Sequence, residues 1–102
     1  MTSVDVSVAE STPQLKALPK IFESAVVAVR STGEVVDAVG DLARSSEVIA
    51  RAVAIAAAVL SSLEPELGAR LLKIEVDYTT ANVAIYVDRD VLKISVVSME
   101  GG

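Results

Sequence analysis

The chain has 102 residues, a formal net charge of −5, and neither histidine nor cysteine. That length suits a single domain. Hydrophobic residues make up 52% of the chain but aromatic residues only 3%, so valine, isoleucine, leucine and alanine must build the core. The acidic balance and the lack of a basic cluster argue against nucleic acid or an anionic membrane surface as partners. Without cysteine, disulfides and thiolate chemistry are excluded.

The sequence also carries no signal for export or membrane insertion. Residues 1–5 lack the basic and apolar regions of a secretory signal peptide. The apolar run at residues 52–60 has nine residues, whereas a membrane-spanning helix needs about 20. We therefore expect a soluble, cytoplasmic protein that does not insert into a membrane and approaches one only through its partners.

A helix-start signal, Thr12 followed by Pro13, divides the first part of the chain. Residues 1–12 are expected to be a flexible segment, although their alternating valines also fit a strand at a sheet edge. A domain is expected at residues 13–98, with a tail at 99–102. The domain should open with a short helix that Pro19 interrupts. The apolar positions of that helix are Leu15, Leu18, Ile21 and Phe22.

A β-hairpin is expected next. An apolar run at residues 25–29 and a second strand-like run at 35–40 flank a polar segment that contains Gly33. Glycine readily adopts the positive φ that a tight reversal needs. Because the first run is apolar on both faces, we expect its strand to lie in the interior of a sheet.

The main helix is expected to begin at Ser45 or Ser46, to carry Glu47 in its first turn and to end at residues 64–66. At about 100° per residue, almost its whole circumference is apolar, which a single core does not explain. We expect a bulky arc to cover the chain's own sheet and a small-residue face to contact another chain. The bulky arc is Val48, Ile49, Ala52, Val53, Ile55, Ala56, Val59, Leu60 and Leu63, and the small face is Ala50, Ala54, Ala57 and Ser61.

Three further strands are predicted at residues 71–78, 83–87 and 92–96, where apolar and polar residues alternate. Short polar turns join them into an antiparallel meander. In the first of these strands Leu72, Ile74, Val76 and Tyr78 should point inward. The predicted fold is α+β, in the order helix-β-β-helix-β-β-β: a five-stranded antiparallel sheet with the long helix on one face and the short N-terminal helix on the other.

This order, with its glycine-centred hairpin, resembles the roadblock (dynein light chain) family and its Ragulator and MglB-type relatives. The resemblance covers roughly residues 14–98 and is carried by residues 26–36, the alanine-rich helix at 48–63 and the meander at 72–97. It implies a dimer with itself or a paralogue, in which the long helices pack together. It also implies a non-catalytic role in binding, scaffolding or regulating a small Ras-like GTPase. The sequence departs from the family by lacking the C-terminal helix that many members carry.

Two surfaces are candidate binding sites. The predicted dimer interface is the small helix face with one neighbouring valine, namely Ala50, Val53, Ala54, Ala57 and Ser61. Helix propensity alone is the alternative explanation of these alanines. The predicted partner-binding group lies on the outer sheet face, where an exposed tyrosine among charges can anchor a partner. It consists of Lys73, Glu75, Tyr86 and Lys93. An ordinary solvated sheet face is the alternative there.

No catalytic, cofactor or metal site is predicted. Asp88 and Asp90 flank Arg89, but a hydrophilic turn explains them and no other ligand cluster accompanies them. Phosphate-binding glycine motifs are absent, as are the histidine and cysteine that commonly act as base and nucleophile. The expected function is that of a dimeric GTPase regulator or scaffold. A purely structural assembly module is the main alternative, and a small-molecule sensor is disfavoured because aromatic residues are scarce and histidine is missing.

Overall fold

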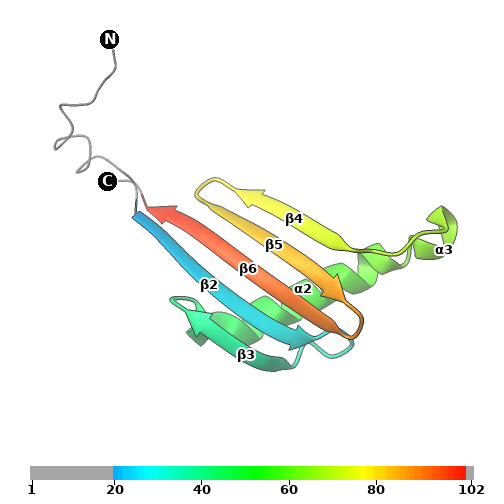
Figure 1. Cartoon of the computed structure of the whole chain (residues 1–102), viewed down its shortest axis with the longest axis horizontal. Coiled ribbons are helices and arrows are strands. Elements are labelled where there is room, and N and C mark those ends of the chain that lie inside the picture. Colours follow the sequence, from blue (N-terminus) through cyan, green and yellow to red (C-terminus); the bar gives the residue numbers. More distant parts are fainter. Residues whose placement is uncertain (1–19, 101–102) are drawn as a thin grey trace, which may run out of the picture.

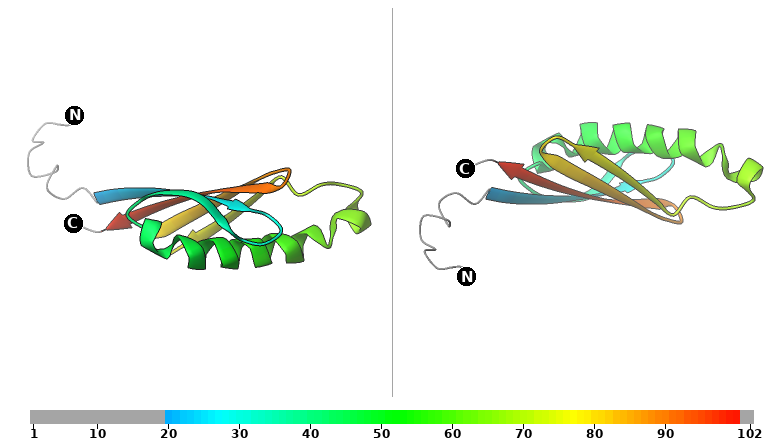
Figure 2. Two further views of the ribbon diagram at one scale, coloured as in Figure 1. Left: turned by 90° about the horizontal axis from the view of Figure 1, so that it is seen from below. Right: turned by 90° about the horizontal axis from the view of Figure 1, so that it is seen from above.

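The computed structural model describes residues 20–100, which form two layers (Figure 1). One layer is a five-stranded antiparallel sheet in the order β3-β2-β6-β5-β4. The other is the long helix α2, which runs along one face of the sheet (Figure 2). The elements are β2 Lys20–Val29, β3 Val35–Gly40, the 3-10 turn η1 Ala43–Ser45, α2 Ser46–Ser61, α3 Glu64–Leu67, β4 Lys73–Tyr78, β5 Ala81–Asp88 and β6 Val91–Glu100. The predicted α+β class and five-stranded sheet are confirmed.

The glycine hairpin is confirmed as well. Strands β2 and β3 pair antiparallel, and Gly33 has a φ of 77° in the turn between them. Strand β2 lies between β3 and β6, so its interior position in the sheet is as predicted.

The predicted N-terminal helix is wrong at its C-terminal end. Ile21 and Phe22 belong to β2, where they pair with Met99 and Ser98 of β6. Pairing with a long neighbouring strand outweighs local helical spacing here, because every residue of β2 has a partner on β6. The remainder of that predicted helix and the segment at residues 1–12 lie outside the described residues.

The long helix begins after a 3-10 turn, and Ser45 is its N-cap residue, with Glu47 in the first turn as expected. It ends at Ser61, earlier than predicted, and a separate short helix, α3, follows. Gly68 closes α3 in the left-handed conformation, with a φ of 61°. Within residues 20–100, no helix is both long and apolar enough to cross a membrane.

The meander is confirmed as β4, β5 and β6, and β6 continues to Glu100, two residues past the expected end of the domain. The buried apolar residues of the sheet all lie on β2, β5 and β6. Edge strand β4 therefore receives only partial cover, and Leu72 and Tyr78, which were predicted to point into the core, are exposed. The core between sheet and helix consists of Val26, Ala28, Ala50, Val53, Ala54, Ala57, Ile85, Leu92, Ile94 and Val96.

Candidate functional site

Helix α2 turns its small residues toward the sheet, which reverses the predicted orientation. Ala50 and Ala57 are completely buried, and Val53 and Ala54 are buried beside them. The chain's own sheet covers these residues, so they leave no surface for a second chain. The choice of this face as a dimer interface is therefore wrong.

The reversal follows from the close approach of the β2–β3 turn to the helix. A Cβ atom on Gly33 would lie 3.2 Å from the Cα of Arg51 and 3.3 Å from the Cβ of Ala54. Side chains larger than alanine at positions 50 and 54 would push the helix away from this turn. The close approach of the turn to the helix therefore explains both the glycine in the turn and the alanines in the helix.

Several bulky residues of α2 point away from the sheet instead, whereas Ile49 and Val53 of the predicted bulky arc do pack against the core. Val48, Ile55 and Val59 expose 72%, 65% and 62% of their surface. They are seven and four residues apart, so they line one stripe of the helix. We call this stripe, with two further exposed residues, the outer seam; its members are Val48, Ala52, Ile55, Val59 and Leu63. Large apolar side chains exposed along one stripe are typical of interaction sites.

Ser61, the last residue of the predicted interface, is half-buried and has a different role. Its Oγ accepts a hydrogen bond of 2.7 Å from Nη2 of Arg30, at the end of the β2–β3 hairpin. The same Nη2 lies 3.9 Å from the carboxylate of Glu64 in α3. That carboxylate in turn accepts a hydrogen bond of 2.7 Å from the backbone N–H of Leu71. Arg30 therefore fastens the C-terminal end of α2 and the start of α3 to the sheet.

The structure does bring together the four residues of the predicted partner-binding group. Lys73 is paired with Tyr86, and Tyr86 with Lys93, so the three lie in one row across β4, β5 and β6. The Lys73 ammonium lies 5.2 Å from the Tyr86 ring centroid and 3.7 Å from the Glu75 carboxylate. The neighbouring row Ile74, Ile85 and Ile94 faces the core. The row with Tyr86 therefore lies on the face opposite α2, as predicted, and Tyr86 is 46% exposed.

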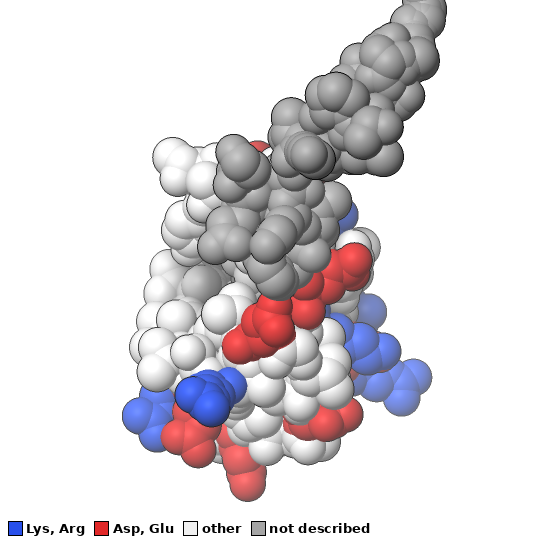
Figure 3. Space-filling model, turned by 90° about the vertical axis from the view of Figure 1, so that its left-hand side faces the viewer, with Lys and Arg blue, Asp and Glu red and all other residues white. Residues whose placement is uncertain are grey.

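Charges at one end of the molecule are dispersed. Figure 3 shows one end of the molecule, where Lys and Arg atoms form small groups separated by acidic and uncharged surface. In the part of the chain that the structure describes, no group of three or more acidic side chains is placed to hold a metal ion. Lys93 forms an ion pair of 3.3 Å with Asp88, so one of the two carboxylates in the turn at residues 88–90 is already paired.

Comparison with protein-family models and with curated proteins gives no match. Solved structures do match. A Roadblock/LC7 domain from Streptomyces avermitilis superposes with a TM-score of 0.65 at 14% identity, over 81% of this chain and 68% of that one. The chain has a roadblock-like fold. The predicted resemblance is thereby confirmed at the level of the fold.

Two bacterial MglB structures support the same conclusion. The gliding protein MglB from Thermus thermophilus gives a TM-score of 0.65 at 20% identity, over 74% of this chain and 59% of that one. MglB from Myxococcus xanthus gives a TM-score of 0.58 at 11% identity, over 89% of this chain and 69% of that one. The chain thus spans less than two thirds of the Thermus protein.

Proposed function

We propose that this protein is a non-catalytic, roadblock-like dimer that binds a small Ras-like GTPase and regulates or scaffolds it. The observation that carries the proposal is the outer seam of α2. Its large apolar side chains face solvent along the only long helix among residues 20–100. A second chain laid along the seam would remove that surface from water, which is favourable by roughly 25 cal/mol per Å² of apolar area.

The partner chain we propose is a second copy or a paralogue. Twofold-symmetric dimers are the commonest oligomers, and they bring the same patch of each subunit together. Ile55 lies midway along the seam, so two seams related by a twofold axis would cross near it. An MglB structure at 21% identity and a TM-score of 0.65 is described in a tetrameric arrangement, which supports self-association of this fold.

The proposal of a GTPase partner has two supports, the resemblance of the sequence to a GTPase-regulating family and the fold that accompanies it. The row Lys73, Tyr86 and Lys93 is the proposed contact surface. Tyrosine is enriched among residues that dominate binding energy. Here Tyr86 is paired with a lysine on each neighbouring strand, and the Lys73 ammonium lies 5.2 Å from the ring centroid. The absence of histidine and cysteine from the sequence supports a role without catalysis.

Light scattering with size-exclusion chromatography tests the dimer. We expect the wild-type mass at micromolar concentration to be that of two chains. Val59→Glu places a charge in the outer seam and should give a folded monomer. Val36→Glu is the matched control, because Val36 is equally exposed, at 63%, but lies on β3; this variant should remain a dimer. A monomeric wild-type protein would contradict the proposal.

Affinity capture tests the GTPase. The protein is immobilised and mixed with small Ras-like GTPases of its own organism, each loaded with GDP or with a non-hydrolysable GTP analogue. Retention in one nucleotide state supports regulation, and equal retention in both states supports scaffolding. If none is retained, the protein is a structural assembly module instead. Tyr86→Ala should reduce retention at least tenfold and leave the dimer intact.

A further inference from the structure

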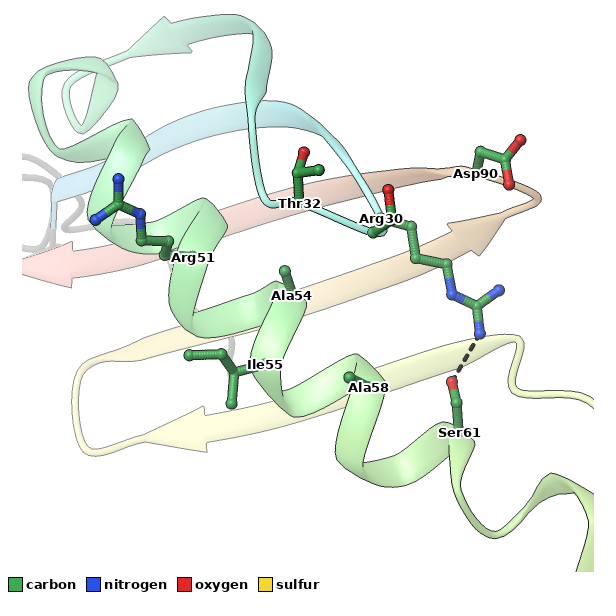
Figure 4. Close-up of a pocket in the computed structure, with 9 residues that line it drawn as sticks. Arg30, Thr32, Arg51, Ala54, Ile55, Ala58, Ser61 and Asp90 are labelled. Carbon is green, nitrogen blue, oxygen red and sulfur yellow. Dashed lines mark hydrogen bonds between the residues drawn. The ribbon is translucent and has the colours of Figure 1, made fainter.

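A pocket of about 480 Å³ lies where the β2–β3 turn, the flank of α2 and the β5–β6 turn meet (Figure 4). This volume falls within the range of small-molecule sites, about 300–1,000 Å³. The turn supplies Arg30, Ser31 and Thr32, and the β5–β6 turn supplies Asp90. The helix supplies Arg51, Ala54, Ile55, Ala58 and Ser61. The proposed GTPase and dimer functions use only Ile55 among these lining residues.

Two arginines line the pocket in a chain whose net charge is −5. Asp90 lies in the same lining, and Arg30 is 3.9 Å from the carboxylate of Glu64. The ion pairs found among residues 20–100 do not include Arg51. A local excess of guanidinium groups attracts anions, and the planar fork of arginine suits the oxygens of a phosphate group.

One side of the pocket is already held in place. Arg30 donates one N–H to Ser61 Oγ at 2.7 Å and another to the carbonyl of Arg89 at 3.3 Å. A guanidinium has five N–H groups, so three of them take no part in these two hydrogen bonds, and Glu64 lies 3.9 Å from Nη2. Because the side chain is fixed before binding, little conformational entropy is lost when an anion arrives.

Hydroxyl groups add further donors. Ser61 Oγ accepts its hydrogen bond from Arg30, and Thr32 Oγ1 accepts one of 3.1 Å from the backbone N–H of Glu34. Each hydroxyl hydrogen therefore remains available to donate. Figure 4 shows Arg51 extending away from Arg30 at the opposite end of the pocket. Arg51 is exposed, so its long side chain is free to turn toward a bound anion.

We infer that this pocket binds a small phosphate ester with hydroxyl groups, such as a sugar phosphate. The phosphate group lies between Arg30 and Arg51 and accepts hydrogen bonds from Thr32 and Ser61. Asp90, the one carboxylate in this lining, accepts a hydrogen bond from a hydroxyl group of the ligand. Of the helix residues that line the pocket, Ile55 also belongs to the outer seam, so a dimer through the seam covers that wall. Arg51, Ala54, Ala58 and Ser61 lie beside the seam.

Amide chemical shifts of the ¹⁵N-labelled full chain test this inference. The probes are ribose 5-phosphate, inorganic phosphate and ribose, each titrated at constant ionic strength. We expect ribose 5-phosphate to shift the amides of Ser31, Thr32 and Gly33, to saturate, and to bind at least tenfold more tightly than inorganic phosphate. Ribose should shift none of them. Absence of saturable shifts with ribose 5-phosphate, or equal affinity for inorganic phosphate, would overturn the inference.

Two variants separate a built site from general attraction. Arg51→Gln should weaken binding of ribose 5-phosphate about tenfold, since hydrogen bonds to charged groups are strong. Arg44→Gln removes the same charge from the exposed η1 turn, outside the pocket, and should change the affinity less than twofold. An equal loss in both variants would contradict the assigned site. Asp90→Ala should reduce the affinity for ribose 5-phosphate toward that for inorganic phosphate.

Discussion

The inner and outer sides of α2 differ in what their side chains pack against. On the inner side, alanines let the helix approach the sheet and the β2–β3 turn, so the contact is between closely spaced backbones. On the outer side, the larger Val48, Ile55 and Val59 meet no part of residues 20–100 that covers them. The comparison teaches that residue size on a helix reports how near the neighbouring backbone lies. It does not report which side faces the core.

The largest expected effect comes from placing a charge on the inner side. Ala57→Glu would bury a carboxylate in a site with no exposed surface, which costs several kcal/mol and is comparable to the whole stability of a small domain. We expect its thermal unfolding, followed by circular dichroism, to lose its cooperative transition. Ala58→Glu, one residue further and exposed, should unfold like the wild type. If the two variants unfold alike, position 57 does not face the sheet.

A second test concerns the backbone approach itself. Gly33→Ala combines a positive φ with a Cβ only 3.2 Å from the helix backbone, and should lower the free energy of unfolding by about 2–3 kcal/mol. Gly68→Ala has a similar φ but open space around it. Gly68→Ala should lower the free energy of unfolding by about 1 kcal/mol, as expected for alanine in a left-handed backbone conformation without a steric contact. Urea denaturation gives both values, and no difference between them would rule out the steric contact.

The hydrogen bond between Arg30 and Ser61 connects α2 to the β2–β3 hairpin beside the pocket. Arg30 is 29% exposed, so we expect Arg30→Gln to lower the free energy of unfolding by only about 1–2 kcal/mol. A double-mutant cycle with Ser61→Ala should give a coupling energy of about 0.5–1.5 kcal/mol. Strict additivity of the two substitutions would show that the hydrogen bond contributes nothing.

The smallest effect is expected on the outer side. Val48→Ala, measured at a protein concentration where the chain is monomeric, should change the free energy of unfolding by less than about 0.5 kcal/mol. Val53→Ala, on the inner side, should lower it by about 2 kcal/mol, because it leaves a cavity in the core. Both variants replace valine with alanine. Comparable decreases in the free energy of unfolding would therefore mean that the two valines are equally buried.

Much of the fold was predictable because its signals are local. The alternation of residues in the meander and the glycine of the first turn are each readable within a few positions. Ile21 and Phe22 were misassigned because their strand partner, β6, is more than 70 residues away in the sequence. No local pattern reports such a pairing.

The candidate site was predicted only in part. The row containing Tyr86 follows from strand alternation, so its members were identified correctly as neighbours on one face. The predicted dimer interface was placed on the side of α2 that packs against the chain's own sheet, because helical periodicity separates two faces without showing which of them is buried. Gly33 was the available signal: a turn that requires glycine for close approach also requires small residues opposite. The phosphate-ester pocket joins three separate segments and has no single motif.

The position of β6 has a consequence for how the chain reaches its native state. Strand β6 is paired with β2 along all ten of its residues and also with β5, so it joins the β2–β3 hairpin to the β4–β5 hairpin. The two hairpins cannot become one sheet until residues 91–100 pair with both of them. Because β2 and β6 are far apart in the sequence, folding should be slow for a chain of this size.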